Sequence, residues 1–278
     1  MSETVYLNGE FLPKEEAKIS PNDRGFLFAD GVYEVAKYYN GKPFRYDDHI
    51  VRLKRSLAEL SINYKQVDAL KEIFQKLISA NNMESVHAGI YVQITRGAHK
   101  RMHNFPEGIS PTVYAYAFGL SSFTESLENG IKVITKEDIR WQRCDIKSVS
   151  LLPNSMLFNE AIENGAGETI LIRDGFVTEA THSSVLAVKK GTVITRPLSN
   201  LILPGITRKV ILEICTENNI PVEERLFSEK EMFEMDELII AGTGSEVTPV
   251  VQINDQIIGN KKPGEITRFI QKKFFEMV

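Results

Sequence analysis

The sequence predicts an α+β protein of two domains. Its 278 residues exceed the length of most single domains. Segments with strand-like and helix-like hydrophobic periodicity are mixed in both halves of the chain. A mostly polar, aperiodic stretch at residues 121–126 separates the two halves. We therefore expect a small N-terminal domain over 1–120, a linker over 121–126 and a larger C-terminal domain over 127–278.

In the first domain, a strand-like run ends at the dipeptide Asn40-Gly41. Asn-Gly between two such runs is a strong hairpin signal, so a return strand is expected directly after it. Asp47 and Asp48 are suited to cap the helix that follows. The strands and helices expected in this domain span 5–9, 32–39, 43–46, 50–60, 70–78, 89–95 and 112–118.

In the second domain, a helix that ends at Gly165 has a residue suited to the helix C-terminus. The turn Asp174-Gly175 lies between two strand-like runs and predicts a second hairpin. Strands are expected at 131–135, 169–173, 176–179, 185–189, 193–195 and 238–240, and helices at 155–164 and 207–217.

The composition is that of a globular protein, with 42% hydrophobic and 25% charged residues. Lys and Arg number 33 against 37 Asp and Glu, a balance that does not favour nucleic acid. The start of the chain lacks a signal-peptide pattern, and no apolar run is long enough to span a membrane. We therefore expect a cytoplasmic protein. Cys144 and Cys215 lie far apart in apolar patterns and are expected to be buried thiols.

The run from Arg140 to Ser148 contains Lys147 with two arginines nearby. A lysine amine attacks carbonyls only when it is neutral, and both burial and neighbouring cations disfavour its protonated form. Such a lysine can form a Schiff base with an aldehyde cofactor. The alternative is an ordinary exposed lysine on a strand.

Two glycine-containing loops are suited to bind a phosphate group. Leu203-Pro204-Gly205-Ile206-Thr207-Arg208 leads into a helix, whose N-terminus presents free N–H groups and partial positive charge. Gly242-Thr243-Gly244-Ser245 follows a buried strand and offers more N–H and hydroxyl groups. The alternatives are an ordinary helix start and a plain strand-end turn.

Two further positions carry candidate charged groups. Glu179 ends a strand, where its carboxylate could keep a pyridine nitrogen protonated; the alternative is a surface glutamate. Arg101 and His103 lie in a long loop and could bind a carboxylate; the alternative is a solvated basic loop. His99 and His103 form an i, i+4 pair, but the flanking residues predict a loop, so we expect no metal site. The remaining histidines, His49, His87 and His182, have no evident partners.

Taken in order, these segments resemble the class IV, fold-type IV pyridoxal-phosphate enzymes, and among them the bacterial D-amino acid aminotransferases. The resemblance runs nearly end to end. Its strongest stretches are 23–25 with 30–35, 93–97 with 101–103, 137–141 with 144–148, 205–208, and 235–238 with 245–249.

The resemblance implies a small N-terminal α/β domain and a larger mixed C-terminal domain with a barrel-like sheet. It implies pyridoxal 5'-phosphate as the cofactor, held by Lys147 as a Schiff base. The same lysine would move the proton at the substrate Cα, and Glu179 would pair with the pyridine nitrogen. Leu203 would pack on the cofactor ring. The phosphate would be held by Arg52, Gly205, Ile206, Thr207 and Thr243.

The resemblance also implies a carboxylate trap made by Tyr33, Arg101 and His103. In this family the loop carrying the last two comes from the neighbouring subunit, so a homodimer is implied. The activity implied is ping-pong transamination between a D-amino acid such as D-alanine and a 2-oxo acid such as 2-oxoglutarate. An L-branched-chain aminotransferase, an aminodeoxychorismate lyase and a cofactor-binding protein without turnover are the alternatives.

The sequence departs from the family pattern at three positions. Ser184 and Leu186 stand where relatives carry Asn and an aromatic residue. Gly242 stands where D-specific relatives tend to carry serine. These departures place one cofactor-side hydrogen bond and one phosphate contact in question.

Overall fold

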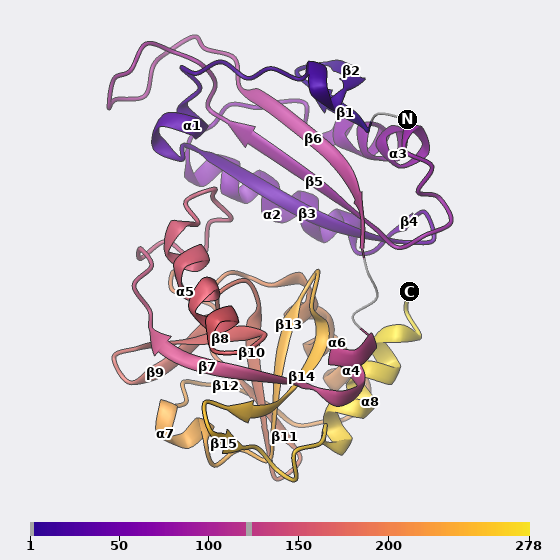
Figure 1. Ribbon diagram of the computed structural model, residues 1–278, viewed down its shortest axis with the longest axis vertical. Coiled ribbons are helices and arrows are strands. Elements are labelled where there is room, and N and C mark those ends of the chain that lie inside the picture. Colours follow the sequence, from indigo (N-terminus) through magenta and orange to yellow (C-terminus); the bar gives the residue numbers. More distant parts are fainter. Residues whose placement is uncertain (1–2, 121–123) are drawn as a thin grey trace. The chain divides into compact units, whose positions relative to one another are not determined.

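The computed structural model describes residues 3–120 and 124–278, which form two compact units (Figure 1). One unit holds residues 3–120 together with 146–150, and the other holds 124–145 and 151–278. The segment 146–150, which the sequence-based division gave to the C-terminal domain, therefore packs with the N-terminal unit. Of the expected linker, residues 121–123 lie outside the described residues, and Thr124–Asn129 forms helix α4.

The described residues of the N-terminal unit form a six-stranded antiparallel sheet in the order β2-β1-β6-β5-β3-β4. The Asn40-Gly41 turn is confirmed: both residues have positive φ, and Tyr39 pairs with Lys42 across it. The strands are β1 (Thr4–Leu7), β2 (Glu10–Pro13), β3 (Gly31–Tyr39), β4 (Lys42–Pro43), β5 (Ala88–Thr95) and β6 (Thr112–Gly119).

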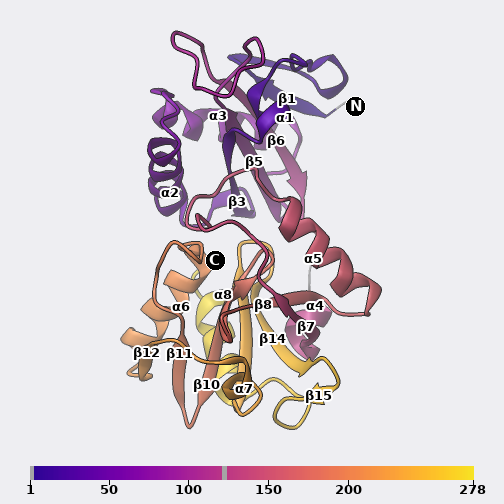
Figure 2. The ribbon, with the colours of Figure 1, turned by 90° about the vertical axis from the view of Figure 1, so that its left-hand side faces the viewer.

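Helices α2 (Tyr46–Glu59) and α3 (Leu70–Ala80) cover one face of this sheet (Figure 2). Their apolar residues, such as Leu53 and Leu77, are fully buried against it. The expected cap of α2 is corrected, because Arg45 is the N-cap and Asp47 and Asp48 lie in the first turn. There their charges still favour the helix dipole. The unit also contains α1 (Arg24–Phe28) and the 3₁₀ turns η1 (Lys14–Glu16) and η2 (Val67–Ala69).

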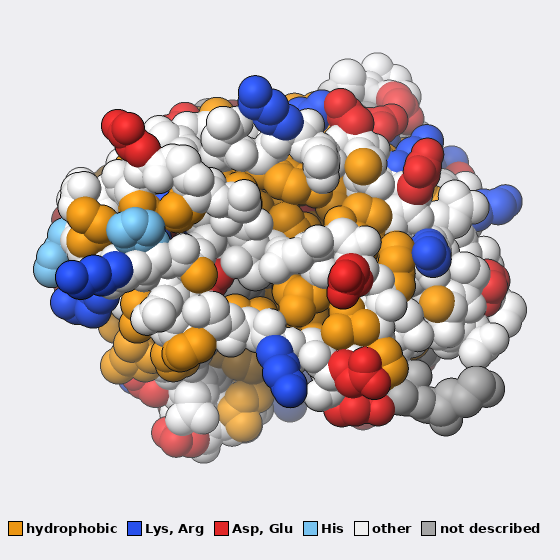
Figure 3. Space-filling view, turned by 90° about the horizontal axis from the view of Figure 1, so that it is seen from above, with side chains coloured by type: hydrophobic (Ala, Val, Ile, Leu, Met, Phe, Trp, Pro, Cys, Tyr) orange, Lys and Arg blue, Asp and Glu red, His pale blue; other side chains and the backbone are white. Residues whose placement is uncertain are grey.

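The opposite face of the sheet carries a row of half-buried aromatic rings. Neighbouring ring centroids along this row are 5.2 to 5.8 Å apart. The row consists of Tyr33, Tyr91, Tyr114, Tyr116 and Phe118. Figure 3 views the N-terminal unit from above and shows hydrophobic side chains across the middle of the visible face, with charged ones chiefly at its edge.

The described residues of the C-terminal unit form a curled nine-stranded mixed sheet. Its main path runs β12-β11-β10-β13-β14-β7-β8-β9, and β15 pairs with β14. The strands are β7 (Ile131–Glu137), β8 (Glu168–Arg173), β9 (Phe176–Ala180), β10 (Ser184–Lys189), β11 (Thr192–Thr195), β12 (Val222–Glu224), β13 (Glu237–Gly242), β14 (Glu246–Ile253) and β15 (Gln256–Ile257). The barrel-like sheet implied by the resemblance is confirmed.

Helices surround this second sheet, and α6 and α8 lie side by side. The helices are α4, α5 (Leu152–Glu163), α6 (Ile206–Glu217), α7 (Glu229–Met232) and α8 (Glu265–Phe275). Strand β14 and helix α8 were not predicted. Pro249 interrupts the strand pattern of β14, because proline cannot donate a ladder hydrogen bond. Among the described residues, no helix is long and apolar enough to cross a membrane.

Candidate active site

Glu179 is a buried carboxylate at the end of β9, with 6% of its surface exposed. Its Oε1 accepts a hydrogen bond from Arg140 Nη1 at 2.5 Å, and its Oε2 accepts one from the Leu203 N–H at 3.0 Å. Burial raises the pKa of Glu179, and the Arg140 guanidinium offsets only part of that rise. The alternative of a surface glutamate is therefore wrong.

Arg140 links Glu179 to a second buried carboxylate, that of Asp138. Its Nε and Nη2 donate to the two Asp138 oxygens at 2.9 Å each, and Thr178 Oγ1 donates to one of them. Burial acts to raise the pKa of Asp138, but the hydrogen bonds and charge of Arg140 outweigh it, so this pKa is lowered. The arginines near Lys147 were expected to depress its protonation. In the structure Arg140 binds Asp138 and Glu179, and Arg143 binds Asp145.

The N-terminus of α6 lies beside Glu179, because Leu203 donates to that carboxylate and Gly205 is the N-cap. No side chain caps this helix start, so first-turn N–H groups stay available to an anion. Gly205 has to be glycine here, since a Cβ would lie 2.5 Å from Ser184 Oγ. The serine at this departure from the family pattern thus lies against the helix start.

The second loop, between β13 and β14, joins the same cluster through hydroxyl groups. Ser245 Oγ lies 2.9 Å from Ser183 Oγ, and Thr248 Oγ1 donates to the Ser245 carbonyl at 2.5 Å. A Cβ on Gly242 would lie 2.8 Å from Ser245 Oγ and 3.2 Å from Ser183 Oγ. Two serine hydroxyls therefore fill the space that a side chain at this departure would need. Thr243 follows Gly242 and is half-buried.

A buried carboxylate that was not predicted supports the turn between β9 and β10. Glu168 is fully buried and accepts hydrogen bonds from the Thr181 N–H at 3.2 Å and from the Thr181 hydroxyl. Its Oε2 also lies 2.9 Å from His182 Nδ1. The expectation that His182 lacks a partner is wrong. Only the acidic residue at the start of β8 could have signalled this contact.

In the N-terminal unit, Lys147 is held as an added strand beside the start of β3. The Tyr33 N–H donates to the Lys147 carbonyl at 3.0 Å, and Val32 forms a β-bridge with Ser148. Ile146 is buried in the core of this unit. The half-buried Lys147 places its Nζ 4.2 Å from the centre of the Tyr33 ring. Two predicted site residues are thereby brought together.

Arg52 is buried on the face of α2 that packs against β3. Its Nε and Nη2 donate to Glu34 at 2.7 and 2.9 Å, and His49 Nδ1 lies 2.8 Å from the same carboxylate. Burial acts to raise the pKa of Glu34, but Arg52 and His49 lower it well below its usual range. Neither Glu34 nor the partner of His49 was predicted. The i, i+3 spacing of His49 and Arg52 on one helix was the available signal.

Arg101 and His103 lie in the exposed loop between β5 and β6 and pack on Phe28 of α1. The Arg101 guanidinium lies 5.2 Å from the centre of the Phe28 ring, and the His103 ring lies 5.7 Å from it. Within the described residues, no recorded contact joins this pair to Tyr33 or Lys147. The predicted trap is therefore not assembled by the contacts of one N-terminal unit.

The predicted residues thus fall into two groups, each described within its own unit. Contacts in the C-terminal unit connect Glu179 with the starts of α6 and β10. Contacts in the N-terminal unit connect Lys147 with Tyr33. The first group comprises Glu179, Leu203, Gly205, Ile206, Thr207 and Thr243, and the second comprises Tyr33, Arg52, Arg101, His103 and Lys147.

Known proteins match the chain over nearly its whole length. Residues 31–253 match the family "amino-transferase class IV". The D-alanine aminotransferase of Bacillus licheniformis is 42% identical over 96% of this chain and 94% of its own length. That of Staphylococcus haemolyticus is 42% identical over 97% and 96%.

Solved structures match as well. A branched-chain amino acid aminotransferase of Escherichia coli superposes with a TM-score of 0.92 at 28% identity, covering 99% of this chain and 94% of that one. A branched-chain amino acid aminotransferase of T.th., solved with pyridoxamine 5'-phosphate, has the same fold, with a TM-score of 0.90 at 23% identity over 99% and 94%.

The Glu34–His49–Arg52 cluster predicts a pH dependence of stability. Burial lowers the pKa of His49 in the folded protein. The unfolded chain, with an ordinary His pKa of about 6.5, therefore binds more protons as pH falls through that value, and stability is lost there. We expect the unfolding midpoint in urea to fall between about pH 7 and pH 5 and to fall less in His49→Gln. An equal slope in both proteins would contradict this assignment.

Proposed function

The chain belongs to the class IV aminotransferase family, and we propose that it transfers the amino group of a D-amino acid, such as D-alanine, to a 2-oxo acid such as 2-oxoglutarate. The observation that carries this proposal is the 42% identity to D-alanine aminotransferases over nearly the full length of both chains. The residues that this chemistry requires are present in the positions described above.

Several features of the C-terminal unit fit pyridoxal 5'-phosphate as the cofactor. Glu179 is buried, and each of its oxygens keeps a lone pair beyond its single recorded hydrogen bond. The uncapped start of α6 suits a phosphate group, as does the loop that carries Thr243. When bound, the cofactor draws electrons away from the substrate Cα and so makes its proton removable.

The protein's residues would divide the remaining work between them. Lys147 would attach the cofactor and then carry a proton to and from the substrate Cα, which a positioned amine does efficiently. Glu179 would keep the pyridine nitrogen protonated. Leu203 would pack on the ring. The phosphate would be held by Arg52, Gly205, Ile206, Thr207 and Thr243.

Tyr33, Arg101 and His103 would bind the substrate carboxylate in a homodimer. Tyr33 lies beside Lys147, whereas Arg101 and His103 are in contact with Phe28. A second copy that contributes the loop would complete the trap, and the exposed positions of Arg101 and His103 leave them available to it. Fixing the carboxylate sets which face of Cα meets the lysine, and hence the preference for D-amino acids.

Two other activities on the same fold are the alternatives: L-branched-chain transamination and aminodeoxychorismate cleavage. The E. coli branched-chain enzyme supports the first only at 28% identity. The Arg101-x-His103 pair favours the D-specific activity, since neither alternative is expected to use it. A cofactor-binding protein without turnover is disfavoured because Lys147 and Glu179 are present together. The departure at Leu186 is a fully buried core position in β10.

We expect purified protein to produce pyruvate from D-alanine and 2-oxoglutarate, and not from L-alanine. Lys147→Ala should lower this rate by at least about 10²–10⁴-fold, the usual contribution of a positioned proton-transfer group. Borohydride reduction followed by peptide mapping should place the cofactor on Lys147. Pyruvate formation from L-alanine alone would overturn the stereochemical assignment.

Arg101→Gln should weaken the binding of every substrate that carries a carboxylate. Loss of a charged hydrogen bond costs about 1.5–3 kcal/mol, so KM for D-alanine should rise roughly ten- to a hundredfold. The cofactor absorbance should stay unchanged. Lys100→Gln, next to it in the loop, is the control, and equal KM values for Arg101→Gln and the wild type would remove Arg101 from the trap.

Glu179→Gln should leave the cofactor bound but slow the reaction, because a neutral amide cannot keep the pyridine nitrogen protonated. We expect kcat to fall by about 10²-fold or more, the lower end for a positioned charged group, with little change in KM. Stopped-flow absorbance would follow each half-reaction. An unchanged kcat would show that this carboxylate does not face the ring.

A further inference from the structure

Two guanidinium groups share one buried carboxylate beneath the loop between β5 and β6. Arg24 Nε donates to Asp30 Oδ2 at 2.7 Å. Arg96 donates to both oxygens of Asp30, at 2.7 and 2.9 Å. All three residues are at least nine-tenths buried on the side-chain scale. Two positive charges against one negative charge leave donors of the guanidinium groups for other acceptors.

Those other donors bind backbone carbonyls. Arg96 donates to the carbonyls of Ser61 and Leu60, at 2.9 and 2.6 Å, and so ties the end of β5 to the end of α2. Arg24 Nη1 donates to the Met102 carbonyl at 2.6 Å. Met102 is the residue between Arg101 and His103. The guanidinium of Arg24 therefore holds the backbone at the centre of the proposed carboxylate trap.

The same helix supplies the surface on which the two trap side chains rest. Arg24 and Phe28 lie at i and i+4 of α1, on one helix face, with the guanidinium 4.6 Å from the centre of the Phe28 ring. Arg101 and His103 pack on that ring. One turn of helix thus fixes the loop by a hydrogen bond to its backbone and by a ring beneath its side chains.

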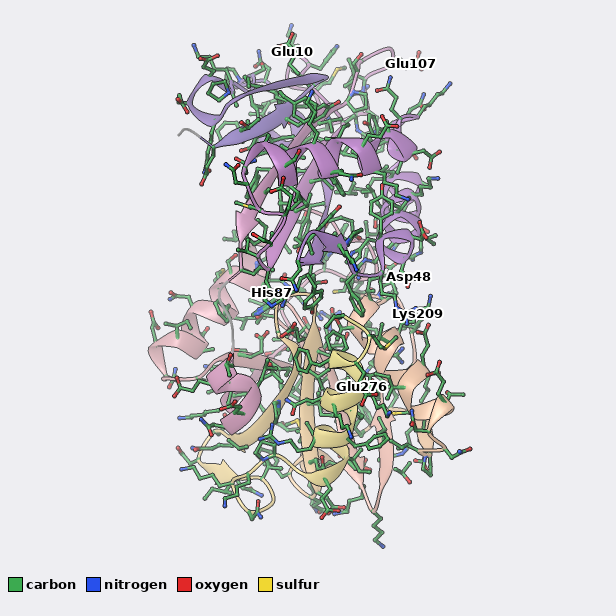
Figure 4. All side chains as sticks on the ribbon, turned by 90° about the vertical axis from the view of Figure 1, so that its right-hand side faces the viewer. Glu10, Asp48, His87, Glu107, Lys209 and Glu276 are labelled. Carbon is green, nitrogen blue, oxygen red and sulfur yellow. The ribbon has the colours of Figure 1, made fainter. Side chains whose placement is uncertain are left out.

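The base of the loop is closed independently of the Arg24 side chain. A Cβ on Gly97 would lie 2.0 Å from the Ser110 carbonyl oxygen, so the two ends of the loop meet there. The Arg24 N–H donates to the Gly97 carbonyl at 2.9 Å. Farther along, the Phe105 ring stacks 3.5 Å from the Arg96 guanidinium while 55% of that residue stays exposed. Glu107, labelled in Figure 4, lies at the outer edge of the same loop.

We propose that Arg24, with Asp30 and Arg96 behind it, is a positioning residue that sets the substrate-carboxylate loop in its binding conformation. The proposal rests on the proposed function, because it assigns Arg24 to act through Arg101 and His103. Arg24 itself would touch neither substrate nor cofactor. Both substrate classes, D-amino acids and 2-oxo acids, carry the carboxylate that this loop would bind, so both should depend on Arg24.

The test is Arg24→Gln in the full-length holoenzyme. Asp30 keeps its two hydrogen bonds from Arg96 in this variant, so no buried charge is left unpaired. KM should rise roughly tenfold or more for D-alanine and for 2-oxoglutarate alike, the effect of losing a charged hydrogen bond, while kcat and the cofactor absorbance stay near the wild-type values. Arg55→Gln, a half-exposed arginine 4.0 Å from Glu59 on α2, is the matched control.

A double-mutant cycle separates positioning from a general structural role. If Arg24 acts through Arg101, Arg24→Gln should add little to KM in the Arg101→Gln background, because the loop then has nothing to position. A full additional loss in that background would overturn the proposal. Equal falls in kcat and cofactor binding, without a selective rise in KM, would also overturn it.

Phe105→Ala provides a second variant in case Arg24→Gln does not fold. Its ring is half-exposed and covers Arg96, so its removal should raise both KM values in the same direction by a smaller factor. An unchanged KM in Phe105→Ala and Arg24→Gln, alongside a raised KM in Arg101→Gln, would overturn the positioning role alone. An unchanged KM in Arg101→Gln would instead overturn the proposed trap on which it rests.

Discussion

The arrangement of the C-terminal unit depends on one guanidinium, that of Arg140, between two buried carboxylates. Asp138 and Glu179 could not both be buried in charged form without it, since removing the shared cation would leave charges in a low-dielectric interior. The same carboxylate that Arg140 holds also accepts the Leu203 N–H. The start of α6 is therefore placed by Glu179. A single ion-pair network thus sets the distance between a carboxylate suited to a pyridine nitrogen and a helix end suited to a phosphate.

The N-terminal unit solves the same problem separately. Glu34 on β3 accepts from Arg52 and His49, and Asp30, just before β3, accepts from two further arginines. These clusters lie on either side of the strand start to which the Lys147 segment is hydrogen-bonded. The flexible side chains of the proposed chemistry, a lysine amine and an arginine in a loop, thereby rest on backbone fixed by buried charge pairs.

Much of this could be predicted from the sequence where local chemistry is specific. The Asn40-Gly41 and Asp174-Gly175 hairpins follow from residues that tolerate positive φ, and the start of α6 follows from its glycine. The partners of buried charges could not be predicted, because they come from distant parts of the chain. Asp138 and Glu179 lie on different strands of the printed sequence, and nothing in either segment names the other. The reason for Gly242 was also hidden, since it lies in the space occupied by Ser183 and Ser245.

The return of residues 146–150 to the N-terminal unit has a consequence for how such a protein can be rebuilt. The chain passes between the units three times: around 121–123, after Asp145 and after Ser150. A fragment that stops at residue 120 would lack Ile146 from its core and would leave the start of β3 as an open edge, a site for unwanted pairing. Neither unit is thus a module that recombination at one junction could exchange. Variation in this architecture has to arrive by point changes or loop grafts, with both halves inherited as one piece.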